Sequence, residues 1–271
     1  MTDKLHLVVR GARGSMAVSG PQYARYGGNT TSFHVDLGGN DHLVIDAGTG
    51  LRPLEHSLGP GPHRFTVLLT HYHWDHIQGL PMFSQIHDPS ATFRFVGATH
   101  AGHDVRQALG GAIGHPWFPV FLTETEASIE FLATRPELAV GPVTVRSIAL
   151  THPHGATGYR LDGPGDSVVI ATDHEAGDAE VDSALAGFAA GAGTLIHDAQ
   201  YSDREYAERK GWGHSTPDAA VDAALASGVR RLVLTSHDVD HSDSAIDELV
   251  TRARARFPLT TGAYEGLTIG L

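Results

Sequence analysis

The stretch that decides the fold is the hexapeptide His71-Tyr72-His73-Trp74-Asp75-His76. Four of its six side chains are good ligands for a divalent metal, because imidazole suits zinc and related ions and a carboxylate adds compensating charge. The hexapeptide follows an apolar run at residues 65–69 that predicts a buried strand. Neighbouring side chains at the mouth of a strand can diverge toward two centres, so this one loop can serve two metal ions.

The composition favours a metal site built from nitrogen and oxygen. The chain of 271 residues contains 19 histidines, as many as its lysines and arginines together, and no cysteine. Disulfides and thiolate ligation are therefore excluded, which leaves zinc, manganese and iron open. The formal charge of −12 argues against a large nucleic-acid footprint. A small anionic substrate stays compatible, because bound metals add positive charge locally.

The order of elements predicts two packed sheets flanked by helices. Strand-like runs at 5–9, 32–37, 43–45, 66–69 and 93–96 come first, and later strands alternate with Ser/Thr-capped helical patterns at 202–209, 216–226 and 242–257. We expect one domain spanning residues 1–271, with an irregular segment at about 98–140 that is either a lid or an oligomer contact. The start of the chain has no long apolar segment, so neither a signal peptide nor a membrane span is expected and a cytoplasmic protein is the default. The sequence leaves open whether the protein forms a homodimer.

Further ligand-capable residues follow later strand-like runs. His152, Asp173 and His237 each come just after such a run. Residues at the ends of successive strands converge on one edge of a sheet, where binding sites are usually built. Together with the 71–76 loop, these residues predict a centre of two metal ions.

This pattern resembles the metallo-β-lactamase superfamily. The likeness covers nearly the whole chain and includes the turn Asp46-Ala47-Gly48-Thr49-Gly50 after the third strand. It implies a four-layer αββα sandwich of the α/β class with the metals at one edge. Carried across by position, it implies that the first metal is held by His71, His73 and His152, that the second is held by Asp75, His76 and His237, and that Asp173 bridges them. His154 competes with His152, and Asp46 is expected to hold the metal loop through hydrogen bonds.

The residues outside the metal set point to a phosphodiester. The stretch Gly213-His214-Ser215-Thr216 resembles ribonuclease Z and related phosphodiesterases, which implies that His214 protonates the leaving group; a surface or helix-capping histidine is the alternative. The segments 10–15 and 26–30 resemble small phosphodiesterase-like hydrolases, and this likeness implies that Arg13 and Asn29 face an anion. The alternative is a Gly-rich hairpin that binds no ligand. His154 and His174 are expected near the substrate, with simple loop roles as the alternative.

We therefore expect a hydrolase with two divalent ions, zinc first and manganese or iron as alternatives. Two metals can share a hydroxide and clamp the attacking and leaving oxygens of a phosphodiester. We count Asp75 among the catalytic groups as well as among the ligands. The acidic chain lacks a basic Gly-rich arm for tRNA, which favours a small or cyclic phosphodiester. The alternatives are hydrolysis of a carboxylic ester, lactone or thioester, and a ligand-binding regulator with little turnover.

Overall fold

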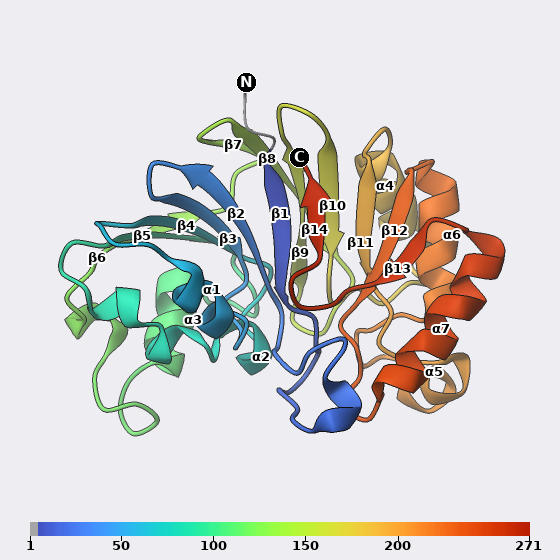
Figure 1. The fold of residues 1–271 in the computed structure, drawn as a ribbon, viewed down its shortest axis with the longest axis horizontal. Coiled ribbons are helices and arrows are strands. Elements are labelled where there is room, and N and C mark those ends of the chain that lie inside the picture. The colour runs from blue at the N-terminus through green and yellow to red at the C-terminus, as the bar shows by residue number, and fades with distance from the viewer. Residues whose placement is uncertain (1–4) are drawn as a thin grey trace.

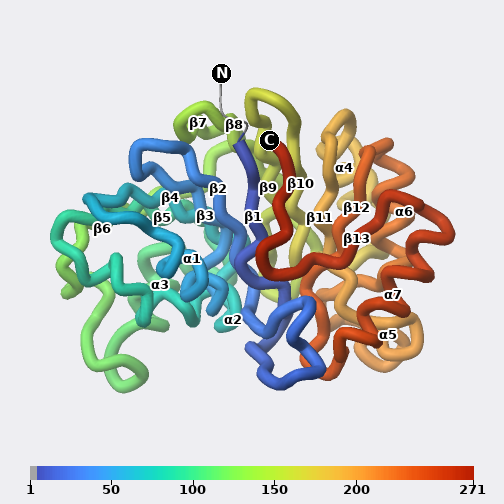
Figure 2. Tube along the Cα trace, in the orientation of Figure 1, coloured from blue at the N-terminus to red at the C-terminus, as the bar shows by residue number. Residues whose placement is uncertain are grey.

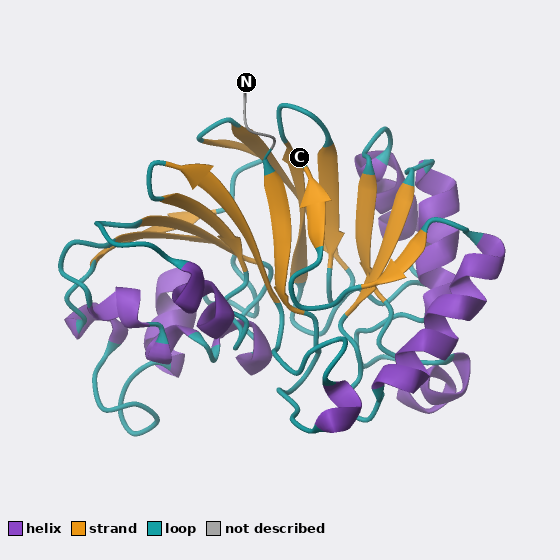
Figure 3. Cartoon of the chain, in the orientation of Figure 1, coloured by secondary structure: helices purple, strands orange, loops and turns teal. Residues whose placement is uncertain are grey.

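The computed structural model describes residues 5–271 of the chain. Two sheets face each other in the middle of the molecule, and helices cover the outer face of each (Figures 1 and 3). The four-layer αββα arrangement expected from the sequence is therefore confirmed. Loops gather along one edge of the two sheets, at the bottom of Figure 3.

The first sheet has the order β14-β1-β2-β3-β4-β5-β6. Strands β3 to β6 run parallel to one another, and β14, β1, β2 and β3 pair in antiparallel fashion. Its strands are β1 (His6–Gly11), β2 (Ser32–Gly38), β3 (Asp41–Ile45), β4 (Arg64–Leu69), β5 (Thr92–Gly97), β6 (Ser128–Ala133) and β14 (Thr268–Gly270). Figure 2 shows the C-terminal segment running beside β1, which brings the two ends of the chain into one sheet.

The second sheet has the order β13-β12-β11-β10-β9-β8-β7. Strands β10 to β13 are parallel, and β7 to β10 pair in antiparallel fashion. Its strands are β7 (Glu137–Val140), β8 (Val143–Leu150), β9 (Ala156–Asp162), β10 (Ser167–Ala171), β11 (Thr194–Asp198), β12 (Arg231–Thr235) and β13 (Thr260–Gly262). Every residue of β10 and β11 is buried, as expected for central parallel strands covered on both faces.

The helices divide between the two outer layers. On the side of the first sheet lie α1 (Leu51–Ser57), α2 (Trp74–Ile77), α3 (Val105–Ala112) and the short 3-10 helices at Leu80–Met82, Ser84–His87 and Leu122–Glu124. On the side of the second sheet lie α4 (Ala179–Ala189), α5 (Asp203–Arg209), α6 (Pro217–Ser227) and α7 (Asp243–Arg256). A further 3-10 helix spans Pro21–Tyr23. None of the helices in residues 5–271 is long and apolar enough to cross a membrane.

The later helices begin where their caps predict. The side chains of Ser202, Thr216 and Ser242 accept backbone N–H bonds at the starts of α5, α6 and α7, and Pro217 occupies the first helical position of α6. These caps satisfy backbone donors that have no partner inside the helix. The helical expectations at 202–209, 216–226 and 242–257 are accordingly confirmed to within one or two residues.

Three apolar clusters correspond to the three boundaries between the four layers. The cluster between the sheets joins Leu7 and Phe33 of the first sheet to Val168 and Ile196 of the second. Another packs the first sheet against α1 and α3, and the third packs the second sheet against α4, α6 and α7. Burial of these faces supplies the main favourable free energy of folding and fixes the two sheets relative to each other.

The segment at 98–140 is more regular than the sequence suggested. It contains α3, and its last part forms β6 and β7, which belong to different sheets. Residues 128–140 therefore cross from one sheet to the other and are not an irregular insertion. The short, mixed sequences of β6 and β7 lie at sheet edges, where alternating exposure hides the strand pattern.

Candidate metal centre

The metal loop begins at the end of β4 and runs into α2. His71 and His76 are almost completely buried there. Asp46, just after β3, accepts hydrogen bonds from the backbone N–H of Thr70 and from Nδ1 of His76, each at 2.8 Å. It also accepts a hydrogen bond from the hydroxyl of Thr70. One buried carboxylate thus fixes the start of the loop and leaves Nε2 of His76 pointing the other way.

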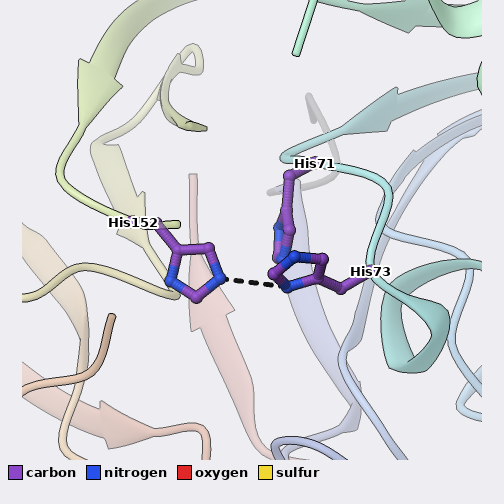
Figure 4. A group of neighbouring side chains, drawn as sticks. All are labelled: His71, His73 and His152. Atoms are coloured by element: carbon purple, nitrogen blue, oxygen red, sulfur yellow. Dashed lines mark hydrogen bonds between the residues drawn. The ribbon is translucent and has the colours of Figure 1, made fainter. Parts of the chain in front are cut away.

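Three imidazoles from two sides of the sandwich form the first group (Figure 4). One nitrogen each of His71, His73 and His152 lie within 4.8 Å of one another, and Nε2 of His152 is 3.1 Å from Nδ1 of His73. Nδ1 of His152 bonds to the carbonyl of Gly213 at 2.8 Å, which orients the ring. His154 is exposed and has φ of 69°, so the structure places His152, and not His154, in this group.

Asp173 lies in the middle of the centre. It follows β10, is buried, and has φ of 53°. Its Oδ1 is 3.3 Å from Nε2 of His76, and its Oδ2 is 3.8 Å from Nε2 of both His71 and His152. Oδ2 of Asp75 is also 3.3 Å from Nε2 of His76. The carboxylate of Asp173 therefore faces both groups, as a bridging ligand would.

The unpaired atoms of the centre fit a divalent metal. Nε2 of His71, Nε2 of His76 and Oδ1 of Asp173 are buried and have no hydrogen-bond partner. A buried polar atom without a partner costs about 1–3 kcal/mol. Nitrogen and carboxylate donors that lie within 4.8 Å of one another suit zinc, manganese or iron, and coordination to divalent ions would satisfy these three atoms.

The electrostatics of the centre also favour a cation. Burial lowers the pKa of His71 far below its usual value and that of His73 to about 4, so both rings are neutral, the form that binds metal. Burial also acts to lower the pKa of His76, but the carboxylates of Asp173, Asp75 and Asp46 outweigh it and raise that pKa well above its usual value. Three buried carboxylates around one imidazole require positive charge, which a proton or a metal ion supplies.

His214 approaches the centre from the loop before α6. Its Nδ1 is 2.7 Å from Oδ2 of Asp198, and its Nε2 is 3.9 Å from Oδ2 of Asp173. Burial acts to lower the pKa of His214, but Asp198 and Asp173 raise it to about 9. The other oxygen of Asp198 accepts the backbone N–H of Ser215 at 2.8 Å. Asp198 therefore fixes the ring of His214 with Nε2 directed at the ligands.

A cavity of about 310 Å³ opens beside the first group of imidazoles. Its lining includes His71 and His73 together with Tyr72, His100, His103, Gln107 and His154. Its lining contains neither a carboxylate nor a lysine or arginine. The residues from α3 and the preceding loop that form one wall belong to the 98–140 segment, so this segment shapes access to the metals.

Comparison with known proteins identifies the family. Residues 42–237 match the model of the β-lactamase superfamily domain, a range that contains all seven predicted metal ligands. The chain belongs to the β-lactamase superfamily. It is 27% identical over 277 residues to ribonuclease Z of Haloarcula marismortui, which covers 84% of this chain and 86% of the relative.

Solved structures of the superfamily share the fold. YhfI of Bacillus subtilis, a metallo-β-lactamase fold protein, superposes with a TM-score of 0.73 at 21% identity, covering 99% of this chain and 100% of YhfI. A diphosphatase of the PhnP family gives a TM-score of 0.71 at 17% identity, covering 99% and 98%. Superfamily membership and the likeness to ribonuclease Z identify the chain as a metal-dependent hydrolase.

One ligand implied by the superfamily pattern is not brought into the centre. Nε2 of His237 bonds to the carbonyl of Ala263 at 2.8 Å, and its ring packs edge-on against Tyr26. Among residues 5–271, no group of neighbouring metal-ligating atoms includes His237. The expectation that His237 binds the second metal is therefore corrected. His237 is the second residue after β12, and its imidazole is engaged by Ala263 and Tyr26.

Three residues expected to bind substrate, Arg13, Asn29 and His174, make structural contacts within the protein. The guanidinium of Arg13 is buried and donates to the carbonyls of Gly27, Asp238 and His241. Asn29 uses its backbone N–H and its side-chain amide to bind Glu265. These contacts hold the N-terminal loops against the C-terminal part of the chain and engage both side chains within the protein.

His174 is likewise engaged elsewhere. It is buried, its Nε2 lies 3.1 Å from a carboxylate oxygen of Asp182, and its Nδ1 accepts the N–H of Thr151. It thus ties the loop after Asp173 to α4 and does not face the cavity. His154, by contrast, does line the cavity, and its ring stands 5.9 Å from that of His73.

The sequence interpretation missed Asp198 and His100. Asp198 ends β11, between the strands that precede Asp173 and His237, so the rule that identified those two residues applies to it as well. His100 lines the cavity and contacts Tyr72 and the hydroxyl of Thr157. No local signal in the sequence distinguishes His100 from the other loop histidines.

Proposed function

We propose that this hydrolase cleaves a small or cyclic phosphodiester and that two divalent ions, zinc in the first instance, take part. The observation that carries the proposal is the Asp198–His214 pair, which directs Nε2 of His214 to within 3.9 Å of the carboxylate of Asp173. Cleavage of a phosphodiester needs a positioned acid for the leaving oxygen, and an imidazole beside the metal ligands is placed to serve as one.

We assign the remaining roles to the other residues of the centre. His71, His73, His152 and Asp173 would hold one ion, and Asp75, His76 and Asp173 the other. Divalent ions in such a site supply Lewis acidity and lower the pKa of water. Asp198 keeps Nδ1 of His214 engaged, so that any proton delivered to the leaving group comes from Nε2.

The cavity supports a compact, anionic substrate. A volume of about 310 Å³ lies at the lower end of ordinary ligand pockets. Its walls carry the imidazoles of His100, His103 and His154 and no carboxylate to repel a phosphate. The lack of lysine and arginine in the lining, together with the net charge of −12, gives no support to binding a long nucleic acid. The likeness to ribonuclease Z supports phosphodiester chemistry.

The test compares substrate classes with protein loaded in turn with Zn²⁺, Mn²⁺ or Fe²⁺. We expect turnover of bis(p-nitrophenyl) phosphate and of cyclic nucleotides to exceed that of lactones and thioesters. Preferred turnover of a lactone or thioester would replace the proposal by acyl chemistry at the same centre. Binding of these ligands without turnover by any of the three metal forms would indicate a regulator.

His214→Gln tests the residue that carries the proposal. Glutamine keeps a polar side chain but cannot deliver a proton, so we expect kcat to fall by about 10²–10⁴-fold with metal content unchanged. His56→Gln, at an exposed position on α1, is the matched control and should retain full activity. Unchanged kcat in His214→Gln would remove this imidazole from the chemistry.

A further inference from the structure

The metal centre is bordered by two exposed indole rings, those of Trp74 and Trp212, which are 53% and 60% exposed. Trp74 stands between His73 and Asp75 in the metal loop, on the side of the first sheet. Trp212 comes two residues before His214, in a loop of the second sheet. An indole is a large and mostly apolar surface, and exposed apolar groups gathered in one place mark interaction sites.

A short series of contacts joins the two tryptophans across the gap between the sheets. Nδ1 of His73, the residue after which Trp74 comes, is 3.1 Å from Nε2 of His152 (Figure 4). Nδ1 of His152 bonds to the carbonyl of Gly213, the residue after Trp212, at 2.8 Å. Gly213 has φ of 92°, and a Cβ at this position would collide with the ring of His152. A group bound at the centre therefore has a tryptophan within one residue of these contacts on either side.

The loop that carries Trp212 is held in place by a buried carboxylate. The two oxygens of Glu175 accept the N–H groups of Gly211 and Gly213, each at 2.7 Å. The hydroxyl of Tyr206 donates to the same carboxylate at 3.0 Å. The backbone is thus fixed on both sides of Trp212, although its ring lies in solvent. A ligand that binds to a fixed ring loses less free energy to the ordering of the protein.

The cavity beside the first group of imidazoles favours a flat, uncharged group as the neighbour of the phosphate. Its lining includes the rings of Tyr72, His100, His103 and His154 and contains no carboxylate, lysine or arginine. Aromatic rings prefer to stack on, or to meet edge-on, other rings. An aliphatic group would gain burial here but would not make these contacts.

We propose that Trp74 and Trp212 form a subsite for a flat aromatic group of the substrate, a nucleobase in the natural case. The proposal rests on the proposed function for the position of the phosphate at the metals, but not on cleavage of the diester. Every base has a π-face, so the subsite selects for the presence of a base and not for its identity. Stacking of this kind strengthens binding by about ten- to a hundredfold in Kd.

Equilibrium binding to zinc-loaded protein tests the proposal without any assay of turnover. The probes are adenosine 5′-monophosphate (AMP) and ribose 5-phosphate, which share the sugar and the phosphate and differ in the base. We expect AMP to bind at least about tenfold more tightly and to quench the tryptophan fluorescence. Equal Kd values for the two probes would overturn the proposal.

Three leucine variants locate the subsite. Trp212→Leu and Trp74→Leu should each reduce the ratio of the two Kd values by about tenfold, with elemental analysis confirming that zinc is retained. Trp117→Leu is the matched control, because Trp117 is 74% exposed on the loop after α3, and it should keep the wild-type ratio. An unchanged ratio in either Trp212→Leu or Trp74→Leu would overturn the paired subsite.

Other occupants of the two indoles give different results. Binding to phosphatidylcholine vesicles that is lost in Trp212→Leu, without a preference for AMP, would make them a membrane contact and overturn the proposal. A dimer in sedimentation that is lost in the same variant, again without that preference, would overturn it in favour of a second copy of the chain. Tryptophan-dependent binding of AMP without turnover of any diester would refute the proposed function and leave the subsite standing.

Discussion

A row of three buried histidines on the first sheet predicts a specific loss of stability in acid. His34 bonds to His42 at 3.1 Å, and His42 bonds to His63 at 3.0 Å, each time from Nε2 to Nδ1. Nε2 of His63 bonds to the carbonyl of Gly59, which only accepts, so that nitrogen carries the hydrogen. At the other end, Arg10 donates to Nδ1 of His34. Every ring therefore donates from Nε2 and accepts at Nδ1, and all three are neutral.

Protonation of His34 is opposed by its surroundings. Burial, and then the charge of Arg10 and the proximity of His42, lower the pKa of His34 to about 3. In the unfolded chain His34 binds this proton near pH 6.5. The free energy of unfolding is therefore not reduced by this residue above pH 6.5, and it decreases as the pH falls from 6.5 toward 3. With about 1.36 kcal/mol for each pH unit below 6.5, the loss from this one residue is about 2 kcal/mol at pH 5.

The assay compares the wild type with His34→Gln, both free of metal, by urea unfolding at pH 7.5 and pH 5.0. Glutamine can accept from Arg10 and donate to His42 but does not titrate. Other titrating groups contribute equally to both proteins, so the wild type should lose about 2 kcal/mol more than the variant over this interval. His56→Gln should behave as the wild type. Equal losses in the wild type and His34→Gln would show that His34 does not resist protonation, and the reasoning would fail.

Two further substitutions test carboxylates that support the centre. Asp198→Asn should lower kcat and also weaken zinc binding, each by about 10- to 100-fold, because Asp198 contacts both Nδ1 of His214 and the backbone N–H of Asp173. Steady-state kinetics measures the change in kcat, and titration measures the Kd for zinc. An unchanged Kd would contradict the expected weakening of zinc binding. Asp46→Asn should weaken zinc binding by a similar factor, since it removes the charged partner of Nδ1 of His76; an unchanged Kd for zinc in the titration would contradict this.

The metal loop and the strand-end ligands could be predicted because two simple patterns coincide there. The strands β4 and β10 are apolar runs in the sequence, and the second residue after each of them, His71 and Asp173, can bind a metal. Parallel strands place such residues at one edge of a sheet, so their sequence separation does not matter. The structure brings His71, His73, His152 and Asp173 together because the carboxyl ends of β4 in the first sheet and of β8 and β10 in the second lie at the same edge of the sandwich.

The errors concern side-chain direction and long-range contacts. Successive residues of an extended chain point to opposite sides, and the turn after β12, where Ser236 has φ of 58°, changes that direction again. The sequence does not indicate which neighbouring residue faces the centre, so the structure does not meet the expectation for His237. The Gly-rich loop suggests an anion as the partner of Arg13, yet its partners, the carbonyls of Asp238 and His241, are more than 220 positions away.

Asp198 contacts both His214, the proposed proton donor, and the backbone of Asp173. Its Oδ2 is 2.7 Å from Nδ1 of His214 and 3.2 Å from the backbone nitrogen of Asp173, while its Oδ1 accepts the N–H of Ser215. A displacement of this one side chain therefore alters both the direction of the imidazole and the position of the carboxylate that faces both metal groups. His214→Gln changes only the imidazole. The pair of variants thus separates the delivery of a proton from the placement of the metals, which a single substitution at either residue does not.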